Sequence, residues 1–87
     1  MIQKEITVMN ASGLHARPAA EFANAAQGFD ASIEISFGGK KKNAKSIIGI
    51  MALGIKQGCT FTLTVAGEDE RKAAECLEAL VRSNFGQ

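Results

Sequence analysis

Three segments of this chain alternate apolar and polar residues with the two-residue period of a strand that buries one face. They are residues 2–9, 31–37 and 60–66. A fourth strand, residues 40–44, is expected after Gly38-Gly39, because two consecutive glycines suit a two-residue hairpin turn. Strands with one apolar face need a cover on that face only, and helical patterns separate them. We therefore predict an α+β fold in which an antiparallel sheet carries its helices on one side.

Two longer helices are expected to supply that cover. Residues 16–27 repeat apolar side chains at helical spacing, and Gly28 should end this helix in a left-handed conformation with Phe29 packed back on it. The last helix should begin at the acidic run from Glu68 to Glu70, which suits the positive end of a helix dipole. Its predicted buried stripe is Ala73, Cys76, Leu77, Leu80 and Val81. Residues 84–87 are expected to fray.

The chain has 87 residues, 46% hydrophobic and 22% charged, and forms one predicted domain over residues 1–87. Its net charge of +1 shows no bias toward nucleic acid or a membrane surface. No apolar run approaches the roughly 20 residues that span a bilayer, and no signal-peptide core follows Met1, so we expect a cytoplasmic protein without membrane insertion. Cys59 and Cys76 lack further ligands for zinc, so no metal or cofactor is expected and both thiols should be at least partly buried.

The only histidine and the only proline of the chain lie in one segment from Gly13 to Ala20, GLHARPAA. Gly13 favours a turn, and Pro18 suits the first turn of the helix that follows, where its missing N–H would have no partner. His15 is then expected at about the N-cap and Arg17 within the first turn, beside free backbone N–H groups and the positive end of the helix dipole. These groups form a predicted anion site.

A phosphoryl group on His15 would place its oxygens against the N–H groups of Ala16 and Arg17 and against the Arg17 guanidinium. The positive end of a helix disfavours a positively charged ring, so a neutral, nucleophilic imidazole is expected. The spacing therefore suits a transient phosphohistidine. Spacing alone leaves a bland alternative open, a solvated loop histidine without a chemical role, because a motif this short also occurs by chance.

A second helix N-terminus is predicted at Ser46, a favoured N-cap residue, in a segment that ends at Gly54. Apolar residues point nearly all round this short helix, although it can bury only one side. We expect Ile50 and Leu53 in the core, and a docking surface formed by Ile47, Ile48 and Met51.

The segment GLHARPAA resembles the active-site segment of the HPr family, the histidine-containing phosphocarriers of the bacterial phosphoenolpyruvate-dependent sugar phosphotransferase system. A second segment, AKSIIGIMALG at residues 44–54, resembles the regulatory-serine region of the same family. The length and the order of elements also agree over the whole chain. The resemblance implies an open-faced β-sandwich, a four-stranded antiparallel sheet with three helices on one face.

The resemblance implies a carrier and not an enzyme. His15 would accept a phosphoryl group from phosphorylated enzyme I and pass it to the A domain (EIIA) of sugar-specific enzymes II, with Arg17 stabilising the phosphate. An HPr kinase/phosphorylase would phosphorylate Ser46 and favour binding to a catabolite-control transcription regulator, although Ile48 stands where the family more often has methionine or phenylalanine. The docking residues it implies are Ser12, Ala20, Ile47, Ile48, Met51 and Gly54. A monomer is expected.

Four alternatives can be separated by sequence or by partner. A nitrogen-branch phosphocarrier would keep the fold and the histidine, so only its partners would distinguish it. A relative that kept only regulation would be expected to lack the histidine, which His15 argues against. A nucleic-acid-binding module is disfavoured because the run Lys40 to Lys42 is short, carries no aromatic residue and suits an edge strand. A hydrolase would need a base beside its nucleophile, and no second histidine exists.

Overall fold

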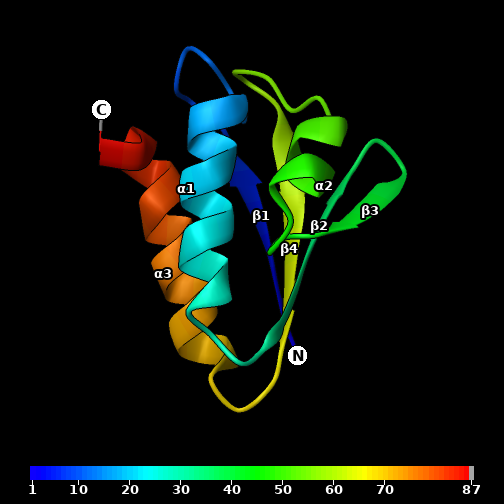
Figure 1. Ribbon diagram of the computed structural model, residues 1–87, viewed down its shortest axis with the longest axis vertical. Helices are drawn as coiled ribbons and strands as arrows, with labels where there is room; N and C mark the ends of the chain where they lie inside the picture. Colours follow the sequence, from blue (N-terminus) through cyan, green and yellow to red (C-terminus); the bar gives the residue numbers. More distant parts are fainter. Residues whose placement is uncertain (87) are drawn as a thin grey trace.

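The computed structural model describes residues 1–86 as a four-stranded antiparallel sheet with its helices on one face (Figure 1). The strands pair in the order β1-β4-β2-β3, which leaves β1 and β3 as the edges. This arrangement confirms the predicted fold class. The elements in chain order are β1 (Ile2–Thr7), α1 (Ala16–Gln27), β2 (Ser32–Phe37), β3 (Lys40–Asn43), α2 (Ile47–Ala52), β4 (Thr60–Ala66), α3 (Glu70–Arg82) and a short 3-10 turn (Asn84–Gly86).

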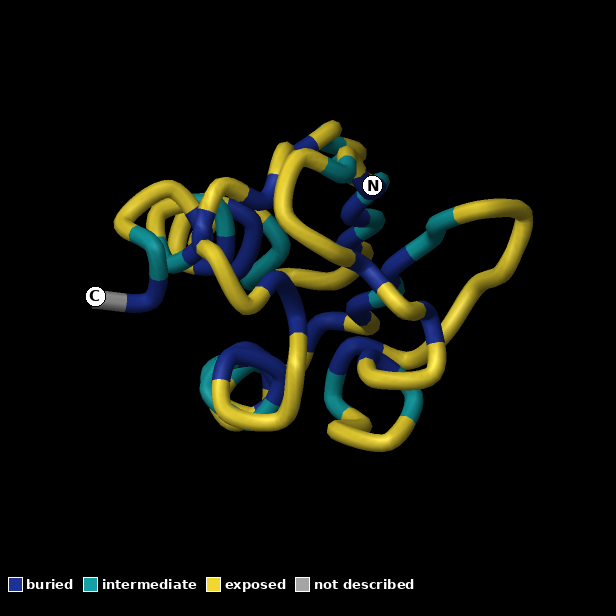
Figure 2. Tube along the Cα trace, turned by 90° about the horizontal axis from the view of Figure 1, so that it is seen from above, coloured by how far each residue is buried: buried dark blue, intermediate teal, exposed yellow. Residues whose placement is uncertain are grey.

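The core lies between the helices and the sheet, and the buried sides of the helices turn toward this shared interior (Figure 2). Each alternating strand sends its apolar residues inward, as its two-residue period requires. Phe22 of α1 and Phe61 of β4 meet edge to face, with ring centroids 6.1 Å apart. The largest fully buried side chains of the core are Val8, Phe22, Ile33, Ile35, Ile50, Phe61, Leu63, Val65, Leu77 and Val81.

Lysines lie on both edge strands of the sheet, exposed to solvent on β3 and paired with a helix on β1. Lys40 to Lys42 lie on β3 and are exposed, as predicted for an edge strand that must not pair with other chains. Lys4 interrupts the apolar face of β1, and its ammonium lies 3.0 Å from the carboxylate of Glu78 on α3. Glu78 also pairs with Arg82 at 2.9 Å. The bond from Lys4, followed by that from Arg82, holds the pKa of Glu78 below its ordinary value.

Two expectations for the helices are wrong. Gly28 does not adopt the left-handed conformation but lies at φ −75°, and its N–H donates to the carbonyl of Ala25 in a tight last turn. Cys76 is exposed, whereas Ala74 belongs to the buried stripe of α3. At 3.6 residues per turn, Cys76 falls more than a quarter turn from the middle of that stripe. Cys59 is partly buried, as expected.

Two element ends also differ from expectation. The ladder of β1 stops at Thr7, although Val8 remains fully buried and its N–H donates to the carbonyl of Cys59. The end of the chain is not frayed at residues 84 and 85, because Phe85 is only 6% exposed and packs on the core. Gln87, part of that prediction, lies outside the described residues. Over residues 1–86, none of the helices is both long and apolar enough to pass through a bilayer.

Candidate functional site

The loop between β1 and α1 is pinned against the segment that leads into β4. Gly13 lies at φ +62°, and a Cβ atom there would sit 2.6 Å from the carbonyl oxygen of Ile55 and 2.7 Å from Cα of Lys56. Only glycine fits such a close approach with a left-handed backbone. The next residue, Leu14, is buried and donates its N–H to that same Ile55 oxygen at 2.9 Å. The chain therefore arrives at His15 along a fixed path.

His15 occupies the N-cap of α1, as predicted, with an extended backbone at φ −78° and ψ −170°. Its carbonyl accepts the N–H of Ala19 at 2.8 Å, while its side chain is exposed and caps no backbone group. The first N–H groups of a helix have no partner inside it, so those of Ala16 and Arg17 are available to an anion. Pro18 follows in the first turn. An exposed imidazole thus stands beside the positive end of a helix of 12 residues.

Arg17 points into solvent from the first turn of α1, with a side chain that is 82% exposed. Its Nε lies 3.6 Å from Oε1 of Glu21, one turn further along the helix. Glu21 was not among the residues expected at this site, although the i, i+4 spacing of an arginine and a glutamate predicts such a pair. An exposed pair of this kind is weak, about 0 to 1 kcal/mol, so the guanidinium is free to move to another anion.

A shallow cavity of about 180 Å³ lies beside His15. Its walls come from three separate parts of the chain: the loop before α1, the end of α2 and the segment after α2. It brings together three of the residues expected at the docking surface, Ser12, Met51 and Gly54, with the imidazole. Its full lining is Ser12, Leu14, His15, Met51, Gly54, Ile55 and Lys56.

The helix α2 begins at Ser46, whose exposed side chain caps it by accepting the N–H of Gly49 at 3.0 Å. Ile50 is fully buried and Leu53 is 7% exposed, as predicted. The other apolar residues form an exposed surface, here called the apolar patch: Ile47, Ile48 and Met51, which are 36%, 82% and 39% exposed. Ala20, the remaining expected docking residue, is half-buried on α1, the helix against which α2 packs.

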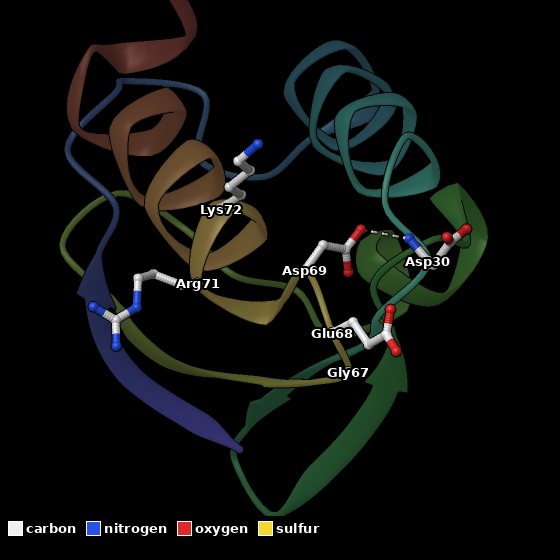
Figure 3. A pocket seen from close by; sticks show the side chains of 6 residues that line it. All are labelled: Asp30, Gly67, Glu68, Asp69, Arg71 and Lys72. Carbon is white, nitrogen blue, oxygen red and sulfur yellow. Dashed lines mark hydrogen bonds between the residues drawn. The ribbon is translucent and has the colours of Figure 1, made fainter.

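A larger cavity of about 550 Å³ lies away from His15, where β4 leads into α3 (Figure 3). Its least exposed acid is the half-buried Asp69, whose carboxylate accepts the N–H groups of Asp30 at 2.8 Å and Ala31 at 2.9 Å. The bond from Asp30 is the main reason that the pKa of Asp69 lies below its ordinary value. Arg71 and Lys72 point away from each other around the rim. The two hydrogen bonds that Asp69 accepts tie the loop before β2 to the start of α3.

Within residues 1–86, no three His, Cys, Asp or Glu side chains lie close enough together to bind a metal ion. The groups beside His15 that could bind an anion are the amides at the start of α1, the Arg17 guanidinium and the His15 ring.

The chain resembles known proteins of one family over most of its length. Residues 2–83 match the family described as "PTS HPr component phosphorylation site". The chain is 40% identical to the phosphocarrier protein HPr of Haemophilus influenzae over 81 residues, 93% of this chain and 95% of that protein. It is 47% identical to the HPr-like protein Crh of Halalkalibacterium halodurans over 81 residues, 93% of this chain and 96% of that protein.

Two solved structures are similar to this chain over most or all of its length. The structure of HPr-C-His from Thermoanaerobacter tengcongensis superposes with a TM-score of 0.97 at 45% identity, covering 100% of this chain and 98% of that one. The structure of a phosphocarrier protein HPr from Bacillus anthracis gives a TM-score of 0.89 at 48% identity, covering 92% of this chain and 95% of that one.

Proposed function

Because this chain belongs to the HPr family of phosphocarriers of the phosphotransferase system, we propose that it carries a phosphoryl group on His15 between phosphorylated enzyme I and the EIIA domains of sugar-specific enzymes II. The observation that carries the proposal is the placement of an exposed imidazole at the N-cap of α1, within the matched phosphorylation-site region. The chain is then a carrier, not an enzyme, and needs no metal or cofactor.

The transfer step needs only the groups present at this helix end. A ring nitrogen of His15 uses its lone pair to attack phosphorus, and the bond between phosphorus and the donor breaks as the new P–N bond forms. The donor keeps the electron pair of the broken bond. The oxygens of the transferred group meet the N–H groups of Ala16 and Arg17, while the Arg17 guanidinium leaves Glu21 for the phosphate. Transfer to the next protein is the same step in reverse.

The surface around His15 suits successive short-lived complexes. The apolar patch, with Ile48 82% exposed, gives each partner a hydrophobic contact beside the cavity that holds His15. Transient complexes use small contact areas with polar rims, and Ser12, Ala20 and Gly54 extend this surface around the patch. We assign docking of enzyme I and of EIIA to this one surface, so that the two partners bind in turn.

Ser46 is the proposed regulatory site, phosphorylated by an HPr kinase/phosphorylase. Its exposed hydroxyl at the N-cap of α2 supports the proposal, because a phosphate there stays next to the N–H of Gly49 that the hydroxyl now caps. Up to roughly two negative charges beside the apolar patch would slow docking to enzyme I and create a surface for a catabolite-control transcription regulator. Incubation with such a kinase and ATP tests this assignment: it is wrong if Ser46 stays unmodified.

The proposal is tested by mixing the purified chain with phosphoenolpyruvate and enzyme I and measuring its mass. We expect a gain of one phosphate that is lost in acid and that His15→Ala abolishes. A His15→Ala variant that still gains the acid-labile phosphate would refute the site. Ser46→Ala is the matched control, since it removes the other proposed phosphorylation site and should leave this gain unchanged.

A regulatory role in a nitrogen branch is the second candidate. Sequence identity does not separate it from the sugar branch, because the chain is 47% identical to a relative named as an HPr-like protein and 48% identical to a named HPr. The two candidates differ in partner choice. Phosphoryl transfer from the loaded chain to an EIIA domain of a sugar permease supports the carrier proposed above, whereas transfer confined to a nitrogen-branch acceptor supports this one.

We propose that the carrier is a cytoplasmic monomer with no affinity for nucleic acid. A 45% identical relative from Thermoanaerobacter tengcongensis has a structure described as an HPr dimer, with a TM-score of 0.81 to this chain. In this chain β1 pairs within its own sheet along Ile2 to Thr7, which supports a closed monomer. Sedimentation over a range of concentrations is the test, and a concentration-independent dimer would contradict it.

A further inference from the structure

Asn10 is the one polar residue among those buried within residues 1–86, with 4% of its surface exposed. Its side-chain Nδ2 donates to the carbonyl of Gly13 at 2.8 Å and to Oγ of Ser12 at 3.3 Å. The backbone carbonyl of Asn10 accepts the N–H of Gly13 at 3.1 Å. Asn10 is therefore hydrogen-bonded to both the carbonyl and the N–H of Gly13, and these two bonds close the turn from residue 10 to residue 13.

Within the described residues, the Nδ2 group of the Asn10 side chain makes all of the hydrogen bonds of this amide. Oδ1 is buried and bonds no other protein group within residues 1–86. Burying an amide oxygen without a protein partner costs stability, so a smaller or apolar residue would be the simpler choice for a plain turn. The bond from Nδ2 to Gly13 is the distinguishing contribution of an amide at this position.

That bond acts on the peptide that leads to His15. The Gly13 carbonyl belongs to the peptide group whose N–H is that of Leu14, and this N–H donates to Ile55 at 2.9 Å. One peptide plane is thus held at its oxygen by Asn10 and at its hydrogen by Ile55. A plane held at both ends cannot rotate, and the direction in which the chain enters α1 is set with it. His15 is the next residue after Leu14.

We propose that Asn10 is a positioning residue for phosphoryl transfer at His15, a role that rests on the proposed function. It holds the Gly13–Leu14 peptide so that the imidazole faces an incoming phosphorus in line with the free amides of α1. Without the amide donor the loop samples other orientations, and a smaller fraction of encounters is productive. A misplacement of about 1 Å at a reacting group can reduce a rate by about a hundredfold. The apolar patch is carried by α2 and is unaffected.

This division gives a distinct kinetic signature. For Asn10→Ala as substrate of enzyme I, we expect kcat to fall about tenfold or more with KM changed by less than about twofold. Asn10→Asp has the same shape but presents a carboxylate oxygen to the Gly13 carbonyl at neutral pH, so its kcat should fall at least as far. A purely structural role would not separate kcat from KM in this way.

Asp69→Ala is the matched control. It removes two hydrogen bonds to backbone N–H groups, those of Asp30 and Ala31, which follow the far end of α1 from His15. All variants are assayed at a temperature where circular dichroism finds each fully folded. The control should keep the wild-type kcat, and amide NMR shifts in Asn10→Ala should change from residue 10 to residue 17 but not in α2.

The outcomes separate the inference from the function on which it rests. If the wild-type chain takes no phosphate from enzyme I, the proposed function fails. If the wild type is phosphorylated but Asn10→Ala or Asn10→Asp keeps the wild-type kcat, only the role of Asn10 is refuted. An equal fall in kcat for Asp69→Ala would also overturn it. Should Asn10→Ala not fold at any temperature, Asn10→Asp under the same assay decides.

Discussion

An alanine at position 13 should weaken the fold and disable His15 together. Gly13 has φ +62°, and an alanine in the left-handed region costs about 1 kcal/mol or somewhat more. Its Cβ would also lie 2.6 Å from the Ile55 carbonyl oxygen and 2.7 Å from Cα of Lys56. Both are backbone atoms, so the loop has to move and the bond from Leu14 to Ile55 is lost, at about another 1 kcal/mol. Displacing the buried Leu14 adds about 1 to 3 kcal/mol.

Gly58→Ala separates the two causes. Gly58 has φ +87°, but a Cβ there meets nothing within 4 Å, so only the conformational cost applies. We expect a loss of about 1 kcal/mol for Gly58→Ala and about 3 to 5 kcal/mol for Gly13→Ala. For a domain of this size, those losses correspond to Tm decreases of roughly 4 to 8 °C and at least about 12 °C.

Urea unfolding and thermal scans of the two variants give both quantities, and phosphorylation by enzyme I is measured on the folded fraction. Gly13→Ala should transfer phosphate slowly even where it is folded, whereas Gly58→Ala should transfer normally. Equal destabilisation of the two variants would refute the argument from backbone crowding. A folded Gly13→Ala variant with the wild-type transfer rate would refute the claim that this contact positions His15.

Three further predictions follow from the surface and from the ion pairs. Arg17→Ala should lower the single-turnover rate of phosphorylation about tenfold or more, but Glu21→Gln should change it by less than about fivefold, because an exposed pair is worth about 1 kcal/mol at most. Ile48→Asp should raise KM for enzyme I about tenfold with an unchanged Tm, since this side chain is 82% exposed; an unaltered KM would exclude it from docking. Asp69 has a folded-state pKa below its ordinary 3.8, so its contribution to stability is present above that value and is lost as the pH falls through the folded-state pKa. Urea stability of Asp69→Asn should therefore vary less than that of wild type between about pH 5 and pH 2.

Local pattern was enough to predict most of the fold. Alternation fixed the strands, because an exposed face and a buried face demand a two-residue period. Gly38 and Gly39 have φ +59° and +81°, the pair of positive values that a tight hairpin of this type needs. Ser46 caps α2 through a bond to a backbone group three residues away, an interaction that the sequence of a single segment already contains.

The features that sequence did not reveal depend on residues brought together by folding. Lys4 looked like a defect in a strand, but its partner Glu78 lies on the last helix. Asp69 looked like charge suited to a helix dipole, yet its carboxylate holds the backbone of Asp30. Asn10 looked like an ordinary turn residue, and only its burial points to a role in holding the Gly13–Leu14 peptide. The first two cases need the distance between two segments and the third needs the burial of a turn, and neither propensity nor spacing contains this information.

The helix α2 extends from one proposed phosphorylation site, Ser46, to the cavity beside the other, His15. We expect the two sites to affect different steps of phosphoryl transfer. Ser46 stands at its start, and Met51 near its end lines the cavity beside His15. The fully buried Ile50 anchors the helix, so a phosphate on Ser46 would alter charge at the apolar patch and leave the helix in place. The path of the chain into His15 depends instead on Asn10, Gly13 and Ile55. A charge at Ser46 should therefore act on the affinity for partners, whereas the loop acts on the rate of transfer once a partner is bound.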